Sequence, residues 1–169
     1  PGNDNWPGEY ALDEDISTFW ESSNNVVGNY VEYDFGSGNE KTITMYGFKI
    51  STADSNMWLN RHPHSWILEG TNDGTTYDVL DVQHEFDEIG YNFGKDYNVV
   101  NVPVSNNTAY QKYRFTVLKV YDSGTILRMQ HMSFYEGRAV GPAGPSVTVT
   151  VSSGAPSGGD NGDIHFKTA

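Results

Sequence analysis

The chain has 169 residues, of which 37% are hydrophobic, 14% aromatic and 19% charged, and its formal net charge is −12. That length suits one domain with an additional segment. A surface with this much negative charge repels phosphate backbones, so no nucleic acid partner is expected. The absence of cysteine excludes disulfides, thiol catalysis and cysteine-ligated zinc, and no apolar run approaches the ~20 residues that span a bilayer, so no membrane insertion is expected.

An acidic loop precedes the first strand-like run. In the segment Asp13-Glu14-Asp15 the two aspartates stand on alternate residues, and the hydroxyl of Thr18 follows shortly after them. Carboxylate, hydroxyl and carbonyl oxygens are the ligands of a hard cation such as Ca²⁺, which an acidic chain attracts. The same pattern also fits a solvated acidic turn capped by Thr18. The residues alone leave both interpretations open.

Strand-like runs rich in aromatic and β-branched residues then alternate with turns. In chain order these runs are Tyr30–Phe35, Thr42–Ser51, Ser65–Gly70, Tyr77–Val82, Asn98–Val104, Lys112–Val120 and Met129–Tyr135. Asn72-Asp73-Gly74 joins the third and fourth runs as a hairpin turn. No segment shows a sustained helical period with caps, so about eight short strands predict an all-β sandwich or jelly roll. Most strand aromatics are expected in its core: Trp20, Tyr33, Phe35, Phe48, Trp66, Phe115 and Phe134.

Residues 138–169 differ in composition from residues 1–137. They are rich in Gly, Pro and Ser and hold one alternating Val/Thr run, Val147–Val151. Such a segment cannot bury a core of its own. The sequence therefore predicts a β-sandwich over residues 1–137 and a linker or assembly tail with one short strand over residues 138–169. Because an isolated strand is not stable in water, this strand is expected to pair with neighbouring chains, most simply in a homo-oligomer.

Four blocks of the first region, in order, resemble the discoidin family, which includes the coagulation-factor type C domains and the family-32 carbohydrate-binding modules. Ala11–Trp20 (ALDEDISTFW) is similar to the family's A-x-D-G-D-x-x-T-x-W opening. The other blocks are Tyr30–Gly36 (YVEYDFG), Arg61-His62-Pro63 with Trp66–Gly74 (WILEGTNDG), and Tyr113–Phe115 with Met132–Tyr135. The resemblance implies a galactose-binding-like jelly-roll β-sandwich. Glu14 stands where the family has glycine, and the strand before the opening block is short or absent.

The resemblance also implies a structural calcium ion that ties the opening loop to the last strand. Its expected ligands are the carbonyls of Ala11 and Asp15, the carboxylate of Asp13, the carbonyl and hydroxyl of Thr18, and a group near the end of the chain's last core strand, taken as Glu136. The role of this ion would be stability rather than catalysis.

A loop tryptophan marks the expected ligand site. Trp58 lies in a turn-rich segment beside Asn60, Arg61 and His62, and an exposed ring among planar donors and acceptors suits a sugar. In family-32 modules, loops at one end of the sandwich bind the sugar, and the loop holding Asn24 and Asn25 is expected at that end together with residues 85–95. The alternative is that Trp58 folds back over the core as a lid.

No catalytic signature is present. The sequence has no G-x-S-x-G, H-E-x-x-H or P-loop pattern, and nothing in it pairs two carboxylates for glycoside hydrolysis. Arg114, in the middle of a strand-like run, is expected to pair or to extend to solvent in a structural role. The domain is therefore predicted to be non-catalytic.

The tail resembles joint segments of phage tail fibres. Gly141–Ser146 forms two collagen-like triplets, and a GAPSGG segment follows at Gly154–Gly159. The combined expectation is a glycan-binding module of a phage tail fibre or related virion protein, at an extracellular or virion surface, whose partners are a cell-surface glycan and other fibre chains. One alternative is a carbohydrate-binding module appended to a secreted bacterial glycoside hydrolase. Another is a purely structural virion or adhesin domain.

Overall fold

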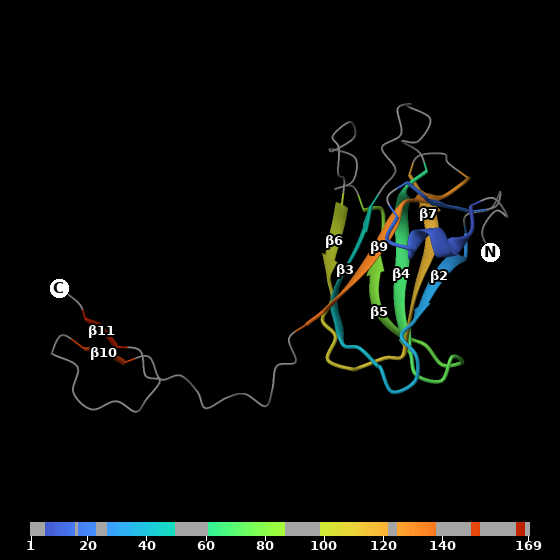
Figure 1. The fold of residues 1–169 in the computed structure, drawn as a ribbon. Helices are drawn as coiled ribbons and strands as arrows, with labels where there is room; N and C mark the ends of the chain where they lie inside the picture. Colours follow the sequence, from blue (N-terminus) through green and yellow to red (C-terminus); the bar gives the residue numbers. More distant parts are fainter. Residues whose placement is uncertain are drawn as a thin grey trace. The chain divides into compact units, whose positions relative to one another are not determined.

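The structure is a computed structural model (Figure 1). It describes residues 6–15, 17–22, 27–49, 61–86, 99–121, 125–137, 150–152 and 165–167. The chain divides into two compact units, Pro1–Gly137 and Arg138–Ala169. Each unit is considered by itself below.

The first unit is a sandwich of antiparallel strands, which confirms the predicted fold class (Figure 1). One sheet has the order β2-β7-β4-β5 and the other the order β6-β3-β9, while β1 pairs with β8. The strands are β1 Trp20–Glu21, β2 Asn29–Asp34, β3 Ile43–Lys49, β4 Pro63–Thr71, β5 Asp78–Gln83, β6 Val99–Pro103, β7 Lys112–Val120, β8 Arg128–Met129 and β9 His131–Glu136. Among the described residues the only helical element is the single 3₁₀ turn η1, Gly8–Ala11, where no helix was expected.

The core lies between the two sheets because inward and outward side chains alternate along each strand. On β7 the inward residues Tyr113, Phe115 and Val117 are completely buried, and the residues between them are only partly buried. Trp66 of β4 packs edge-on against Phe48 of β3, with ring centroids 5.2 Å apart, so aromatic rings join the two sheets.

The predicted core aromatics differ in how far they are buried. Trp20, Phe48, Trp66 and Phe115 are completely buried, as predicted. Tyr33 is 38% exposed, which corrects its assignment to the core. It lies on β2, the outermost strand of the four-stranded sheet, so no further strand of that sheet covers it. Phe35 and Phe134 are partly buried and pack against a small second cluster formed by Ile43, Tyr110 and Tyr113.

The predicted hairpin is present between β4 and β5. Asp73 accepts hydrogen bonds from the backbone N–H groups of Thr75 and Thr76, both at 2.7 Å, and these bonds lower the pKa of its carboxyl. Gly74 has a φ of +70°, a conformation that glycine adopts without steric cost. The turn leaves β5 at the edge of its sheet, with Val79 and Val82 exposed.

The described residues of the second unit form two short strands, whereas one was expected at Val147–Val151. The strands β10 (Thr150–Ser152) and β11 (His165–Lys167) pair in parallel. Thr150 and Val151, the described end of the Val/Thr segment, thus pair with residues of the same chain in this structure, and pairing with neighbouring chains stays a prediction. Residues 147–149 lie outside the described part of the chain.

Candidate functional site

Oxygen atoms converge on the hydroxyl of Thr18 in the acidic opening loop. The Thr18 Oγ1 atom lies 2.8 and 3.0 Å from the two carboxylate oxygens of Asp13, 2.9 Å from the Asp15 carbonyl oxygen and 3.4 Å from the Tyr10 carbonyl oxygen. A hydroxyl has one proton to donate, so it cannot satisfy all these acceptors at once. The cluster therefore has the donor set that a hard cation takes.

Local hydrogen bonds hold this loop in shape. The Asp13 carboxylate accepts the backbone N–H of Asp15 at 2.9 Å. The Asp15 carboxylate accepts the hydroxyl and backbone N–H of Ser17, which lowers the pKa of Asp15. The Asp15 side chain is thereby engaged with Ser17, and the backbone carbonyl of Asp15 is the group that approaches the Thr18 hydroxyl. Glu14 has a φ of +61°, a conformation that favours glycine, which explains why the resembling family has glycine at this position.

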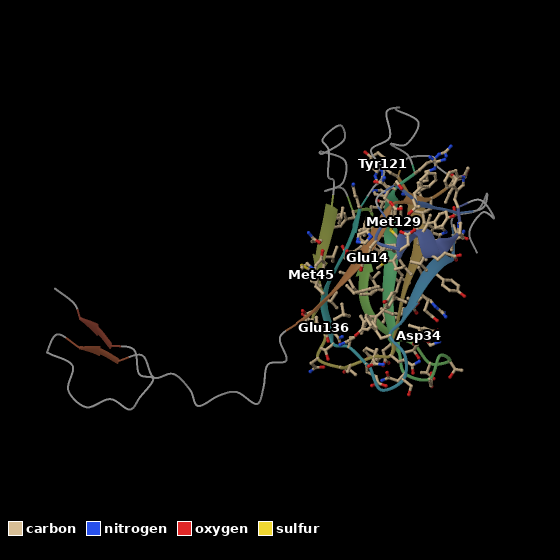
Figure 2. All side chains as sticks on the ribbon, in the orientation of Figure 1. Glu14, Asp34, Met45, Tyr121, Met129 and Glu136 are labelled. Carbon is tan, nitrogen blue, oxygen red and sulfur yellow. The ribbon has the colours of Figure 1, made fainter. Side chains whose placement is uncertain are left out.

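The described oxygen contacts of Thr18 do not include two of the five expected metal ligands, Ala11 and Glu136. The carbonyls that approach the Thr18 hydroxyl belong to Asp15 and Tyr10. The Glu136 carboxylate lies 3.4 Å from Lys41 Nζ and is about half exposed, and Figure 2 shows Glu136 lower in the view than Glu14. β9 itself lies beside the loop, because Leu12, Glu14 and residues 131–135 line a common cavity of about 360 Å³, whereas Glu136 is not among the residues that line it.

Metal sites built from side chains alone are not found in the part of the chain that the structure describes. No group of three or more His, Cys, Asp or Glu is placed there to hold a metal ion. A cation in the opening loop would therefore depend on the Asp13 carboxylate together with carbonyl and hydroxyl oxygens. This dependence is typical of calcium and not of zinc.

A cluster of one carboxylate and two guanidinium groups lies at one end of the sandwich. Glu21 of β1 pairs with Arg61, at 3.3 Å from its Nη1 atom, and with Arg128 Nε of β8. Burial lowers the pKa of Arg128, and the neighbouring Glu21 opposes this shift. The Arg128 guanidinium also lies 4.2 Å from the centroid of the Phe19 ring, on which Trp6 stacks. Arg61 was an expected sugar contact, and the structure places it in this cluster with about a quarter of its side chain exposed.

Backbone hydrogen bonds tie together the chain segments that leave this end. The Arg128 N–H donates to the Arg61 carbonyl at 2.7 Å, and the Tyr121 N–H donates to the His62 carbonyl at 3.1 Å. The Ser22 N–H donates to the Leu127 carbonyl at 3.0 Å, and the Phe86 N–H donates to the His64 carbonyl at 2.8 Å. These bonds fix at one end the four residues Ser22, Arg61, Phe86 and Tyr121, which border segments 23–26, 50–60, 87–98 and 122–124 respectively.

His62 lies in the interior of the sandwich and not on the surface of this end. Its side chain is completely buried and stacks on Tyr121, with ring centroids 4.9 Å apart. His64 is nearly buried and meets the same tyrosine edge-on, at 5.1 Å. The expectation that His62 contacts a ligand directly is therefore corrected, because no atom of it reaches solvent. Trp58, Asn60, Asn24 and Asn25 lie outside the described residues.

The outer face of the four-stranded sheet holds Arg114, for which the sequence predicted a structural role. The Arg114 guanidinium lies between the rings of Tyr30 and Tyr77, 4.4 and 3.9 Å from their centroids, and pairs with Glu32 at 2.8 Å. The Tyr77 hydroxyl donates to the same carboxylate at 2.7 Å. The predicted structural role of Arg114 agrees with these contacts. Its position in the middle of a strand was the sequence signal for them.

Three comparisons with known proteins bear on this arrangement. The family model of the F5/8 type C domain matches residues 2–130. No curated protein matches the chain.

The described part of the chain contains no helix long and apolar enough to cross a membrane.

Several solved structures with the same fold are carbohydrate-binding modules. CBM32-3 of a family 31 glycoside hydrolase from Clostridium perfringens has a TM-score of 0.63 and 15% identity, over 80% of this chain and 86% of that chain. The family 32 module of Clostridium perfringens NanJ, in complex with galactose, has a TM-score of 0.59 and 13% identity, over 80% and 88%. The family 32 module of Streptococcus pneumoniae EndoD has a TM-score of 0.59 and 12% identity, over 81% and 88%. At these identities the likeness shows the fold alone.

Proposed function

Because the chain belongs to the F5/8 type C domain family, we propose that its first unit is a non-catalytic module that binds glycans with the loops at one end of the sandwich. The observation that carries this proposal is the set of backbone hydrogen bonds that fix Ser22, Arg61, Phe86 and Tyr121 at that end. Binding loops need such a scaffold, because a site on rigid supports loses less conformational entropy when its ligand binds.

The chemistry of the segments attached to this scaffold suits a sugar. Trp58 supplies a ring face for the apolar C–H side of a pyranose, and Asn24, Asn25 and Asn60 supply amide donors and acceptors for its hydroxyls. Arg61 stands at the root of the same segment with part of its guanidinium exposed. The NanJ module of the same fold is in complex with galactose, and another from Clostridium perfringens is in complex with GalNAc-β-1,3-galactose. These neighbours support a galactose-type or N-acetylated ligand as the first to test.

The same proposal includes a structural calcium ion in the opening loop. Asp13 would contribute its carboxylate, Thr18 its hydroxyl, and Tyr10 and Asp15 their carbonyls, since these oxygens already converge within 3.4 Å of the Thr18 hydroxyl. The ion would neutralise crowded oxygens that one proton cannot satisfy. Its effect would be on stability, because binding to the native state alone shifts the folding equilibrium by mass action.

The protein that carries this module is proposed to be extracellular, and two carriers remain candidates. The collagen-like triplets of the tail favour a virion fibre whose chains associate through residues 138–169. The structural neighbours favour the second carrier, a secreted glycoside hydrolase, because one of them is a module of a family 31 glycoside hydrolase. On a fibre, several copies of the module would make weak sugar binding effective through multivalency. In an enzyme, one copy would hold the attached catalytic domain near its substrate.

A glycan array probed with the complete chain tests the proposal. Binding to a defined group of glycans, with no release of reducing sugar during long incubation, is the expected result. Binding to none of the arrayed glycans would favour the purely structural alternative. Sugar release by the purified chain would contradict the assignment as non-catalytic.

A further inference from the structure

A groove of about 750 Å³ lies between η1 and β2. One wall is five consecutive strand residues, 30–34, and the other is formed by Pro7, Gly8, Glu9, Leu12 and Asp13. Residues that follow one another in a strand point to opposite faces, so all five can line one groove only if the groove follows the edge of the strand. Figure 1 shows η1 lying beside β2.

The edge of β2 that faces this groove is unpaired among the described residues. β2 is the outermost strand of its sheet and pairs only with β7. The Phe35 N–H donates to the Gln111 carbonyl at 2.9 Å, which continues the register that places Asp34 opposite Lys112. Because antiparallel pairs alternate between hydrogen-bonded and non-hydrogen-bonded positions, the backbone groups of Tyr30, Glu32 and Asp34 are directed away from β7. The groove therefore presents strand donors and acceptors that another chain could pair with.

The groove is acidic and lacks basic residues. Its lining includes four carboxylates and no Lys, Arg or His; Glu9, Glu32 and Asp34 stay available with a calcium ion in the opening loop, whereas the fourth, Asp13, would be bound to that ion. Glu32 and Asp34 point to the outer face of the sheet, where Arg114 and Lys112 of β7 contact them at 2.8 and 3.1 Å. A carboxylate has acceptor sites for more than one donor, so basic side chains could approach both residues from the groove side as well. Glu9 is exposed and forms no ion pair within the described residues.

The two faces of β2 differ, and this difference defines an occupant. Tyr30, Glu32 and Asp34 lie on the outer face, whereas Val31 and Tyr33 lie on the inner face, towards Leu12 of the other wall. A strand that paired with this edge would place alternate side chains opposite the acidic residues and the intervening ones opposite the apolar residues. Basic side chains fit the first set, and apolar side chains fit the second. The contact of Arg114 with Tyr30 and Glu32 already shows that this strand holds a guanidinium.

We propose that the groove along the free edge of β2 binds an extended peptide segment of a partner protein, as an added strand in which basic and apolar residues alternate. Charge complementarity, the unpaired strand edge and the division between acidic and apolar faces support this partner. Such strand addition obtains affinity from main-chain hydrogen bonds and specificity from alternate side chains. None of the residues that line the groove is an expected sugar contact or belongs to the Glu21, Arg61 and Arg128 cluster, so the proposal does not depend on sugar binding.

A pair of synthetic peptides tests this proposal with the complete chain. The first is about nine residues long with Lys and Val alternating, and the second is the same peptide with N-methyl groups on alternate residues, which blocks one pairing edge. The first is expected to bind and to shift the backbone amide resonances of residues 8–13 and 30–34. The N-methylated peptide keeps its charge and should bind roughly tenfold more weakly, because several main-chain hydrogen bonds are lost.

Two charge variants separate this groove from general attraction to an acidic protein. Glu9→Lys should weaken binding of the Lys/Val peptide several-fold, whereas Glu40→Lys makes the same change of charge on a turn outside the groove and should leave binding unchanged. The proposal is wrong if the Lys/Val peptide does not bind, if the N-methylated peptide binds equally well, or if both variants weaken binding to the same extent. Tighter binding of a cationic glucosamine oligomer, with shifts at the same resonances, would also overturn the assignment to a peptide.

Discussion

The indole N–H of Trp66 donates to the hydroxyl of Tyr46 at 2.5 Å, in the completely buried layer between the two sheets. The Tyr46 hydroxyl in turn donates to the Asp81 carboxylate at 2.6 Å. Three strands, β3, β4 and β5, are thereby joined by one chain of hydrogen bonds. The indole N–H of Trp66 has no access to water. Loss of the Tyr46 hydroxyl would therefore leave a buried donor without an acceptor and destabilise the core.

Replacing Tyr46 with Phe should lower the free energy of unfolding by roughly 1–3 kcal/mol, since it leaves a buried indole N–H without an acceptor. Urea denaturation at neutral pH measures this change. Tyr135→Phe is the matched control, because Tyr135 is 40% exposed and the same loss of a hydroxyl should have little effect there. Equal stability of the two variants would show that the hydrogen bond between Trp66 and Tyr46 contributes nothing measurable.

The pH dependence of stability should also depend on Tyr46. Burial and the neighbouring Asp81 raise the pKa of Tyr46 above its usual value of 10. The unfolded chain therefore releases this proton at a lower pH than the folded chain. The contribution of the neutral Tyr46 hydroxyl to the free energy of unfolding is therefore fully present below about pH 10 and is lost progressively as the pH rises above that value. Tyr46→Phe should reduce the slope of unfolding free energy against pH in that range, and an unchanged slope in alkaline titrations would contradict the shift.

Removing calcium should lower the melting temperature. Chelator treatment of protein first shown to be loaded with metal is expected to destabilise it, and Asp13→Ala should abolish this sensitivity. Asp15→Asn is the matched control, since the Asp15 side chain contacts Ser17 and only its backbone carbonyl approaches Thr18. The control variant should remain sensitive to chelator. Identical melting of loaded wild-type protein with and without chelator would argue against an ion in this loop.

Sugar binding should depend on Trp58. Trp58→Ala is expected to reduce glycan affinity at least tenfold and to leave the melting temperature almost unchanged, since loss of a stacking ring removes a large part of a small ligand's contact surface. Isothermal titration with the glycans selected by the array, alongside calorimetric melting, measures both quantities. A large loss of stability would instead identify Trp58 as a lid over the core.

The tail should decide between the two proposed carriers. If the module belongs to a fibre, the complete chain should be oligomeric, and a version that ends at Gly137 should be monomeric. Light scattering after size-exclusion chromatography distinguishes these states. The pairing of β10 with β11 within one chain offers a direct alternative to pairing between chains. Monomeric behaviour of both versions would favour the secreted-enzyme carrier.

Local sequence patterns determined much of the fold. The alternation of Lys112–Val120 indicated a strand with one buried face, and Asn72-Asp73-Gly74 indicated the turn of the hairpin. Both are properties of neighbouring residues, because side-chain direction in a strand has a period of two and a tight turn needs particular backbone angles. The acidic loop was also identifiable from its spacing, since the contact between Asp13 and Thr18 spans only a few residues.

Only the tertiary structure decided which distant residues meet. Glu21 and Arg128 are 107 positions apart, and Arg61 joins them from a third segment. No local period contains such a cluster, because it depends on which strands become neighbours. The same reason separates His62 from its expected role, since its adjacency to Trp58 in sequence did not reveal that packing against Tyr121 would bury it. The groove beside β2 likewise exists only because the sheet order β2-β7-β4-β5 leaves that strand at an edge, which the sequence of the strand does not specify.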